Sequence, residues 1–191
     1  MIKIGILGEI GSGKSFVAKK FGYPVFSADR EVTGIYKNNK SCYLKLKRKL
    51  PKFVKKFPID KRELGEAILH NKNNLKKITK TVHPIVRKSM LRFLSSKKNK
   101  KAVILDIPLL LENKLVTKDT ILIYVHAKKK SIKKRLIKRK FFNKKIFNNF
   151  YKMQTAKIAK KKKSDFIIIN NFRSSIVEKQ IKLIKKEIFK K

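Results

Sequence analysis

The chain has 191 residues, of which 53 are Lys or Arg and 12 are Asp or Glu, and its formal net charge is +41. Its 42% hydrophobic content excludes a disordered polycation, and its length supports a core that needs neither a disulfide nor a metal. A single cysteine and the absence of any apolar run near the ~20 residues of a membrane helix predict a cytoplasmic globular protein without membrane contact.

Five short apolar, β-branched runs predict strands that are buried on both faces of a parallel sheet. In chain order they are Ile2–Leu7, Pro24–Phe26, Ala102–Leu105, Thr120–Val125 and Phe166–Ile169. Segments with the apolar spacing of helices lie between them, and Ser175–Glu178 has the pattern of a capping box that opens a final helix. Strand–helix alternation predicts an α/β fold in which helices cover the sheet.

Two of the connecting segments are too long for simple crossovers. Residues 30–98 have helical patterns and no convincing strand, and they predict a helical insertion beside the sheet. Residues 139–164 are strongly basic, with Phe141, Phe142, Phe147 and Phe150 between the lysines. We expect residues 1–191 to form one domain that carries both of these segments.

One motif points to chemistry. The run from Gly8 to Ser15 has the pattern G-x-x-x-x-G-K-[ST], and it lies between a predicted strand and a predicted helix. Such a loop directs backbone N–H groups at the phosphates of a nucleotide, while Lys14 reaches the outer phosphates and the Ser15 hydroxyl binds Mg²⁺. The sequence therefore predicts binding of a nucleotide with Mg²⁺ through Gly8, Gly11, Ser12, Gly13, Lys14 and Ser15.

Few acids are available to act beside that loop. Asp29 follows the second predicted strand, and Asp106 ends the third, so both belong at the same carboxyl edge of the sheet as the loop. A catalytic base or a metal ligand would have to lie at this carboxyl edge, beside the phosphate loop. From its position alone, Asp29 is equally a base or the N-cap of the next helix. From the residues alone, His83 and Pro84 indicate a helix break with a packed imidazole.

The whole pattern resembles the dephospho-coenzyme A kinase family, from Ile2 to about Asn171. Besides the phosphate loop, the resemblance rests on Phe26–Asp29, Val82–Pro84 with Arg87, Asp106–Glu112, Arg135 with Arg139, Gln154, and Lys163–Asn170. The Pro-Leu-Leu-x-Glu and His-Pro elements in this order are much more specific than the loop. The sequence departs from the family's pattern at three positions. Ser27 replaces an aspartate, and Asn149 stands where an arginine before the Gln is common. Phe172 stands where the family often has a glycine after the Asn.

The resemblance implies a three-layer α/β/α P-loop NTPase fold of the nucleotide-kinase type. This fold has a five-stranded parallel sheet, a helical substrate-binding insertion at about 30–98 and a helical lid at about 128–163. It also implies transfer of the ATP γ-phosphoryl group to the ribose 3′-hydroxyl of dephospho-coenzyme A. A monomer is expected.

The resemblance further implies roles for individual residues. The implied catalytic residues are Asp29, Lys14, Arg135 and Arg139, and Asn170 is implied on the nucleotide side. The implied substrate-binding residues are Asp29, His83, Arg87, Pro108, Leu109 and Glu112. Arg135 and Arg139 are four residues apart, so they share one face of a helix.

Two alternatives stay open at this point. One is another phosphate-loop kinase that acts on a nucleoside or nucleotide. The other is a nucleic-acid-binding NTPase that uses the basic residues 127–163. Against the latter, only 8 of the 53 basic residues are Arg, the residue that binds phosphates and base edges with two hydrogen bonds. We attribute most of the Lys excess to compositional bias on solvated surfaces, and we expect no nucleic-acid partner.

Overall fold

A computed structural model describes residues 1–107, 117, 119–137 and 157–190. Its contacts divide these residues into two compact units. The first unit contains residues 1–27 and the described residues from Lys97 onward, and the second contains Ala28–Ser96.

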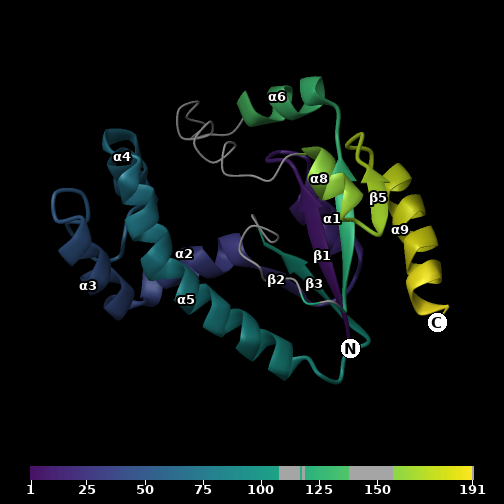
Figure 1. The fold of residues 1–191 in the computed structure, drawn as a ribbon, viewed down its shortest axis with the longest axis horizontal. Helices are drawn as coiled ribbons and strands as arrows, with labels where there is room; N and C mark the ends of the chain where they lie inside the picture. Colours follow the sequence, from purple (N-terminus) through teal and green to yellow (C-terminus); the bar gives the residue numbers. More distant parts are fainter. Residues whose placement is uncertain (108–116, 118, 138–156, 191) are drawn as a thin grey trace. The chain divides into compact units, whose positions relative to one another are not determined.

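The first unit is built on five parallel strands: β1 (Ile2–Gly8), β2 (Val25–Ser27), β3 (Ala102–Asp106), β4 (Thr120–His126) and β5 (Phe166–Ile169). Their order in the sheet is β2-β3-β1-β4-β5, so β1 is the central strand (Figure 1). All four strand pairs are parallel. The predicted five-stranded parallel sheet is confirmed.

The register of the strands brings their carboxyl ends to one edge. Gly8 at the end of β1 pairs with Val125 of β4, and His126 pairs with Ile169 of β5. On the other side of the sheet, Ser27 at the end of β2 pairs with Asp106 at the end of β3. Because all strands run in the same direction, the segments that leave them here begin close together.

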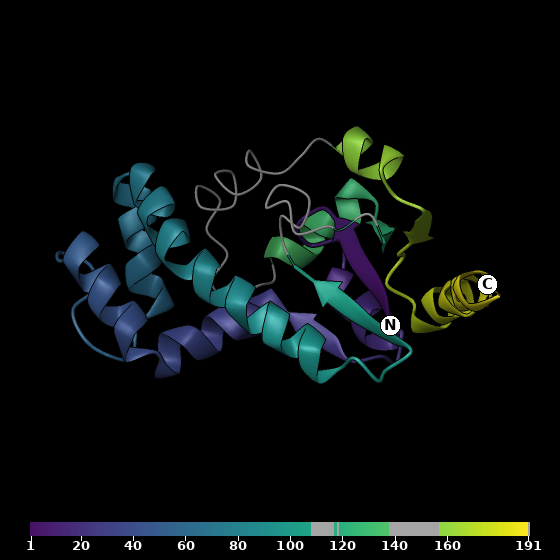
Figure 2. The ribbon, with the colours of Figure 1, turned by 60° about the horizontal axis from the view of Figure 1, so that its bottom comes forward.

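Four helices accompany the sheet in the first unit: α1 (Lys14–Lys20), α6 (Lys129–Ile137), α8 (Lys157–Lys162) and α9 (Ser174–Phe189). Figures 1 and 2 show α1 and α8 on opposite sides of β1. On the α1 side, α1 and α9 contribute buried side chains to one hydrophobic cluster with the strands. Its members include Ile4, Ile6, Val17, Phe21, Ile104, Ile123, Ile168, Val177 and Ile181.

The capping box predicted at the start of α9 is wrong. The helix begins at Ser174, and the preceding Arg173 makes no side-chain cap. The Ser174 hydroxyl donates to the Glu178 carboxylate over 2.8 Å, and the Lys20 ammonium pairs with the same carboxylate at 2.6 Å. Glu178 therefore connects Ser174 at the start of α9 to Lys20 of α1, and the N-cap residue makes no capping-box bond.

The second unit consists of four helices: α2 (Ala28–Asn38), α3 (Lys40–Lys49), α4 (Lys61–His70) and α5 (Asn73–Ser96). Asn39 and Asp60 cap α3 and α4 by accepting backbone N–H bonds from Cys42 and Arg62. The helix break predicted at Pro84 is wrong, because α5 continues through it for three further turns. The proline only removes one N–H donor from the helix.

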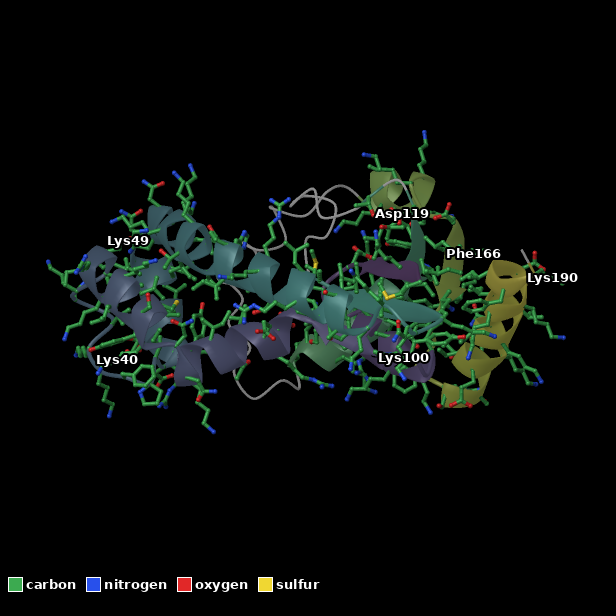
Figure 3. All side chains as sticks on the ribbon, turned by 90° about the horizontal axis from the view of Figure 1, so that it is seen from below. Lys40, Lys49, Lys100, Asp119, Phe166 and Lys190 are labelled. Atoms are coloured by element: carbon green, nitrogen blue, oxygen red, sulfur yellow. The ribbon has the colours of Figure 1, made fainter. Side chains whose placement is uncertain are left out.

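Most lysines lie on the outside of the two units. Lys40, Lys49 and Lys100, which Figure 3 labels, are all exposed. Among the described lysines, Lys160 is the one that is buried, at 3% exposure. This distribution agrees with an excess of lysine on solvated surfaces.

Candidate phosphate-binding site

The loop from Gly8 to Ser15 joins the carboxyl end of the central strand to α1, as its motif predicts. Gly8 and Gly13 have positive φ values of 148° and 92°, a backbone region that residues with a side chain rarely adopt. A Cβ atom added at Gly8 would lie 2.7 Å from the Val125 carbonyl oxygen. At Gly13 it would collide with the side-chain amide of Asn170. Glycine is therefore required at both positions for the loop to curl beside its neighbours.

Lys14 lies over this loop. Its Nζ donates to the carbonyl oxygens of Gly8, over 3.1 Å, and of Glu9, over 2.9 Å. Lys14 and Ser15 are the first two residues of α1, so their own N–H groups have no acceptor within the helix. The Ser15 residue is exposed, and a hydroxyl oxygen is the kind of hard ligand that Mg²⁺ accepts. This end of α1 has the charge and donors that an anion requires.

Asn170 supports the loop from the side of β5, and it is exposed by only 2%. Its Nδ2 donates to the Ser12 carbonyl oxygen over 2.8 Å, and its Oδ1 accepts from the Phe172 N–H over 2.9 Å. Its own N–H donates to the His126 carbonyl oxygen over 2.7 Å, which continues the ladder between β4 and β5. Asn170 thus ties the sheet to the phosphate loop, while contact with the nucleotide stays a prediction.

Helix α6 approaches the same loop. A Cβ atom added at Gly11 would lie 3.0 Å from Ile132 and 3.1 Å from Leu136, both on α6. Arg135, the residue before Leu136, is exposed, and its guanidinium carbon lies 4.4 Å from the centre of the Phe172 ring. The structure therefore brings together the loop, Asn170 and Arg135, which the sequence had placed in one site.

The acids lie where their strands end. Helix α2 begins at Ala28, so Asp29 is inside its first turn, and the alternative of an N-cap at Asp29 is wrong. Its backbone carbonyl accepts from the Thr33 hydroxyl over 2.7 Å, and its side chain is exposed. Asp106 is buried, at 4% exposure, beside Ser27 in the sheet register.

The remaining predicted site residues belong to the second unit or lie outside the described residues. His83 and Arg87 lie one turn apart on α5, in the second unit, and both are exposed. Partial desolvation lowers the pKa of His83 below its usual value of 6.5. Pro108, Leu109, Glu112 and Arg139 lie outside the described residues, as do Asn149 and Gln154.

Two further properties concern the described part of the chain. None of its helices combines the length and the apolar character of a membrane span. No three His, Cys, Asp or Glu side chains within it gather as a metal-binding group.

A parallel sheet whose central strand runs through this loop into a helix defines a phosphate-loop nucleotide-binding protein. A family model described as dephospho-CoA kinase matches residues 2–176. The dephospho-CoA kinase of Wolbachia pipientis wMel is 34% identical over 185 residues, which cover 94% of each chain. The chain belongs to the dephospho-CoA kinase family.

Solved structures agree with this assignment. A dephospho-CoA kinase from Campylobacter jejuni has a TM-score of 0.65 and 26% identity, and the match covers 99% of this chain and 98% of the other. A crystal structure of a Thermus thermophilus protein has a TM-score of 0.79 and 28% identity, over 98% and 97% of the two chains. The enzyme is therefore an ATP-dependent phosphotransferase, and the resemblance found in the sequence is confirmed over the two alternatives.

Proposed function

We propose that this enzyme transfers the γ-phosphoryl group of ATP to the ribose 3′-hydroxyl of dephospho-CoA, as a monomer in the cytoplasm. One observation carries the proposal: a complete phosphate loop in a chain whose residues 2–176 match a single kinase family. The products would be CoA and ADP. No nucleic-acid partner is part of the proposal.

The loop would bind the phosphates of ATP. Backbone N–H groups around Gly11 and Gly13 would surround the phosphate oxygens, and Lys14 would exchange its present carbonyl acceptors for the β- and γ-phosphates. This exchange is favourable because a bond from an ammonium to phosphate is stronger than one to a neutral carbonyl. Ser15 would hold Mg²⁺, which neutralises charge on the phosphates when it is bound.

Asp29 would act as the general base. It follows Ser27, the last residue of β2, by two positions, and Ser27 lies at the carboxyl edge of the sheet. In the reaction the 3′-hydroxyl gives its proton to Asp29, its oxygen bonds to the γ-phosphorus, and the bond from that phosphorus to ADP breaks. Arg135 and Arg139 would stabilise the negative charge on the transferring oxygens.

The second unit would bind the rest of dephospho-CoA, and residues 128–163 would act as a lid. In support, Lys76, Lys80, His83 and Arg87 are spaced by three or four residues, so they form one exposed stripe along α5. A cavity of about 490 Å³ adjoins this stripe, lined by Arg48, Lys49, Lys76, Lys77 and Lys80. Such a surface suits the phosphates of the substrate. Pro108, Leu109 and Glu112 are proposed as further substrate contacts from the family pattern.

The reaction is tested by measuring ADP release from ATP with one acceptor at a time. Dephospho-CoA should stimulate release, whereas nucleosides, nucleotides and RNA should not. Identification of the product by mass, with one phosphate added to dephospho-CoA, completes the test. Stimulation by a nucleotide or RNA without stimulation by dephospho-CoA would refute the proposal.

The proposed base is tested by Asp29→Asn. We expect kcat to fall by at least about 100-fold with little change in the Kd for ATP, because only the proton acceptor is lost. Glu31→Gln is the matched control, since it removes an acid from the same first turn of α2. If Asp29→Asn retains turnover within about threefold of the wild type, Asp29 is not the base.

The loop lysine is tested by Lys14→Ala. Both the affinity for ATP and kcat should fall, since the ammonium is proposed to bind the β- and γ-phosphates before and during transfer. Lys19→Ala removes an exposed lysine from the last turn of the same helix and should leave both quantities unchanged. Normal kinetics of the Lys14→Ala enzyme would show that the loop does not hold the nucleotide.

The basic stripe is tested by Lys80→Gln. We expect the KM for dephospho-CoA to rise by about two- to fivefold and the KM for ATP to stay constant, since an exposed ion pair contributes little. Lys88→Gln removes an exposed charge from another face of α5 and serves as the control. Equal effects of the two substitutions would indicate a nonspecific loss of positive charge.

A further inference from the structure

Phe172 stands out by its backbone. It follows Asn170 at the end of β5 and has a φ of 67°, the one positive value for a residue other than glycine in the described part of the chain. This left-handed conformation is unfavourable for an aromatic residue. It is held in place because the Phe172 N–H donates to the Oδ1 of the buried Asn170 over 2.9 Å.

The conformation places the Phe172 ring between the phosphate loop and α6. Its Cε1 atom lies 3.4 Å from the position that a Cβ atom would take at Gly13. The guanidinium carbon of Arg135 lies 4.4 Å from the centre of the same ring. The ring therefore lies beside the loop that is proposed to hold ATP and contacts the arginine that is proposed to act on it.

Arg135 is fixed from two directions. Its helix is anchored on the loop by Ile132 and Leu136, whose side chains fill the space beside Gly11. Both side chains are buried, whereas Arg135 between them is exposed. An exposed arginine has many rotamers of similar energy, and stacking on an aromatic face selects among them.

We propose that Phe172 is a positioning residue, whose ring holds the guanidinium of Arg135 beside the phosphate loop before ATP binds. This inference rests on the proposed function, because it takes Arg135 to stabilise the transferring phosphoryl group. The stacking contact is weaker than a charge-assisted bond to phosphate, so ATP can draw the guanidinium from the ring. The ring limits the conformational freedom that Arg135 would otherwise lose in the transition state.

Three substitutions at Phe172 separate this role from simple packing. Phe172→Tyr keeps the aromatic face and should keep kcat within about twofold of the wild type. Phe172→Leu keeps apolar bulk without the ring, and Phe172→Gly relieves the left-handed backbone while it removes the ring. For both we expect kcat to fall by roughly three- to thirtyfold, which is the range of a lost cation–π contact.

The KM for ATP and the midpoint of thermal unfolding distinguish a positioning role of Phe172 from a packing role. If Phe172 only filled space, Phe172→Leu would be nearly silent, and Phe172→Gly would act through stability and not through kcat. We expect instead that kcat falls more than the KM for ATP rises, in folded enzyme well below its midpoint. Tyr23→Leu is the control, since it removes a ring under Lys185 at 4.8 Å outside the site. It should leave kcat unchanged.

A double-mutant cycle with Arg135→Ala tests whether Phe172 acts on kcat through Arg135. If Phe172 acts through Arg135, Phe172→Gly should have little further effect on kcat in an enzyme that already lacks Arg135. Independent, multiplying effects of the two substitutions would overturn the inference, as would full kcat in Phe172→Leu. If wild-type enzyme phosphorylates dephospho-CoA but Arg135→Ala is fully active, the inference fails while the reaction stands. If the wild type does not phosphorylate dephospho-CoA, the proposed function itself fails.

Discussion

The contact between Asn170 and the phosphate loop makes Asn170→Ala an informative substitution. The asparagine amide donates to the Ser12 carbonyl oxygen over 2.8 Å and accepts from the Phe172 N–H over 2.9 Å. Alanine removes both bonds. Because Asn170 is only 2% exposed and Ser12 is fully buried, water has little access to the groups left behind.

The size of the effect follows from these two bonds. A buried polar group that loses its partner costs about 1–3 kcal/mol, and the Phe172 N–H is the less buried of the two groups. We therefore expect the free energy of unfolding to fall by about 2–4 kcal/mol. A typical domain is stable by about 5–15 kcal/mol, so the variant should still fold at room temperature.

The same substitution should weaken ATP binding. Without the Asn170 bond, the backbone at Ser12 and Gly13 must be ordered by the nucleotide, at about 1–2 kcal/mol per residue. For the two residues together the ordering cost is at least about 2 kcal/mol, which corresponds to a roughly thirtyfold increase in the Kd for ATP. Asn170 would then contribute to affinity without touching the nucleotide.

The assay pairs urea unfolding with calorimetric ATP titration, both on the same preparation. Asn74→Ala is the matched control, because Asn74 is also buried and its Nδ2 donates to the Ala67 carbonyl oxygen over 2.9 Å in the second unit. It should lose stability and keep its ATP affinity. An Asn170→Ala enzyme whose Kd stays within about threefold of the wild type would refute the supporting role.

Three further predictions concern other parts of the chain. Gly13→Ala should abolish detectable ATP binding, since φ is 92° and a methyl group has no room, whereas Gly34→Ala, inside α2 with open space around it, should raise the unfolding free energy by about 0.5–1 kcal/mol. Hydrogen bonds from Thr117 and Lys3 lower the pKa of Asp119 from 3.8 to about 2, so its ionised form stabilises the fold above pH 3.8 and this contribution is lost toward pH 2. Asp119→Asn should therefore unfold in urea with a shallower dependence on pH over that interval; an unchanged slope would contradict the assignment. Finally, kcat/KM for ATP should fall as KCl rises from ~50 to ~500 mM, because the net charge of +41 attracts anions; a constant value would exclude electrostatic capture.

The strands and the loop could be predicted because their signals are local. A strand buried on both faces is a nearly continuous apolar run, and each of the five runs became a strand with bounds shifted by one residue at most. The prediction of burial on both faces is wrong for the edge strand β5, where Ile167 and Ile169 are 40% and 59% exposed. The loop motif specifies its own backbone through glycines, and Gly8, Gly11 and Gly13 all have positive φ values. Neither inference depended on knowing which segments are neighbours in space.

The contacts around the loop could not be predicted in the same way. Asn170 is 158 positions from Ser12, and their bond depends on the order of the strands in the sheet, which no local pattern contains. Phe172 adopts a backbone conformation for which sequence preferences favour glycine, so its ring could not be placed from its identity. The prediction of a helix break at Pro84 was wrong because it relied on a local preference alone, and the packing of α5 outweighs that preference.

The position of β1 has a consequence for the synthesis of the chain. The strand that precedes the phosphate loop is made first, but it lies at the centre of the sheet, between β3 and β4, which end at Asp106 and His126. At about 5–20 residues per second, a ribosome reaches these partners many seconds after β1. Asn170 follows later still. A nascent chain, or a fragment that stops before Asn170, therefore carries the entire phosphate-binding motif without the side chain that holds Ser12.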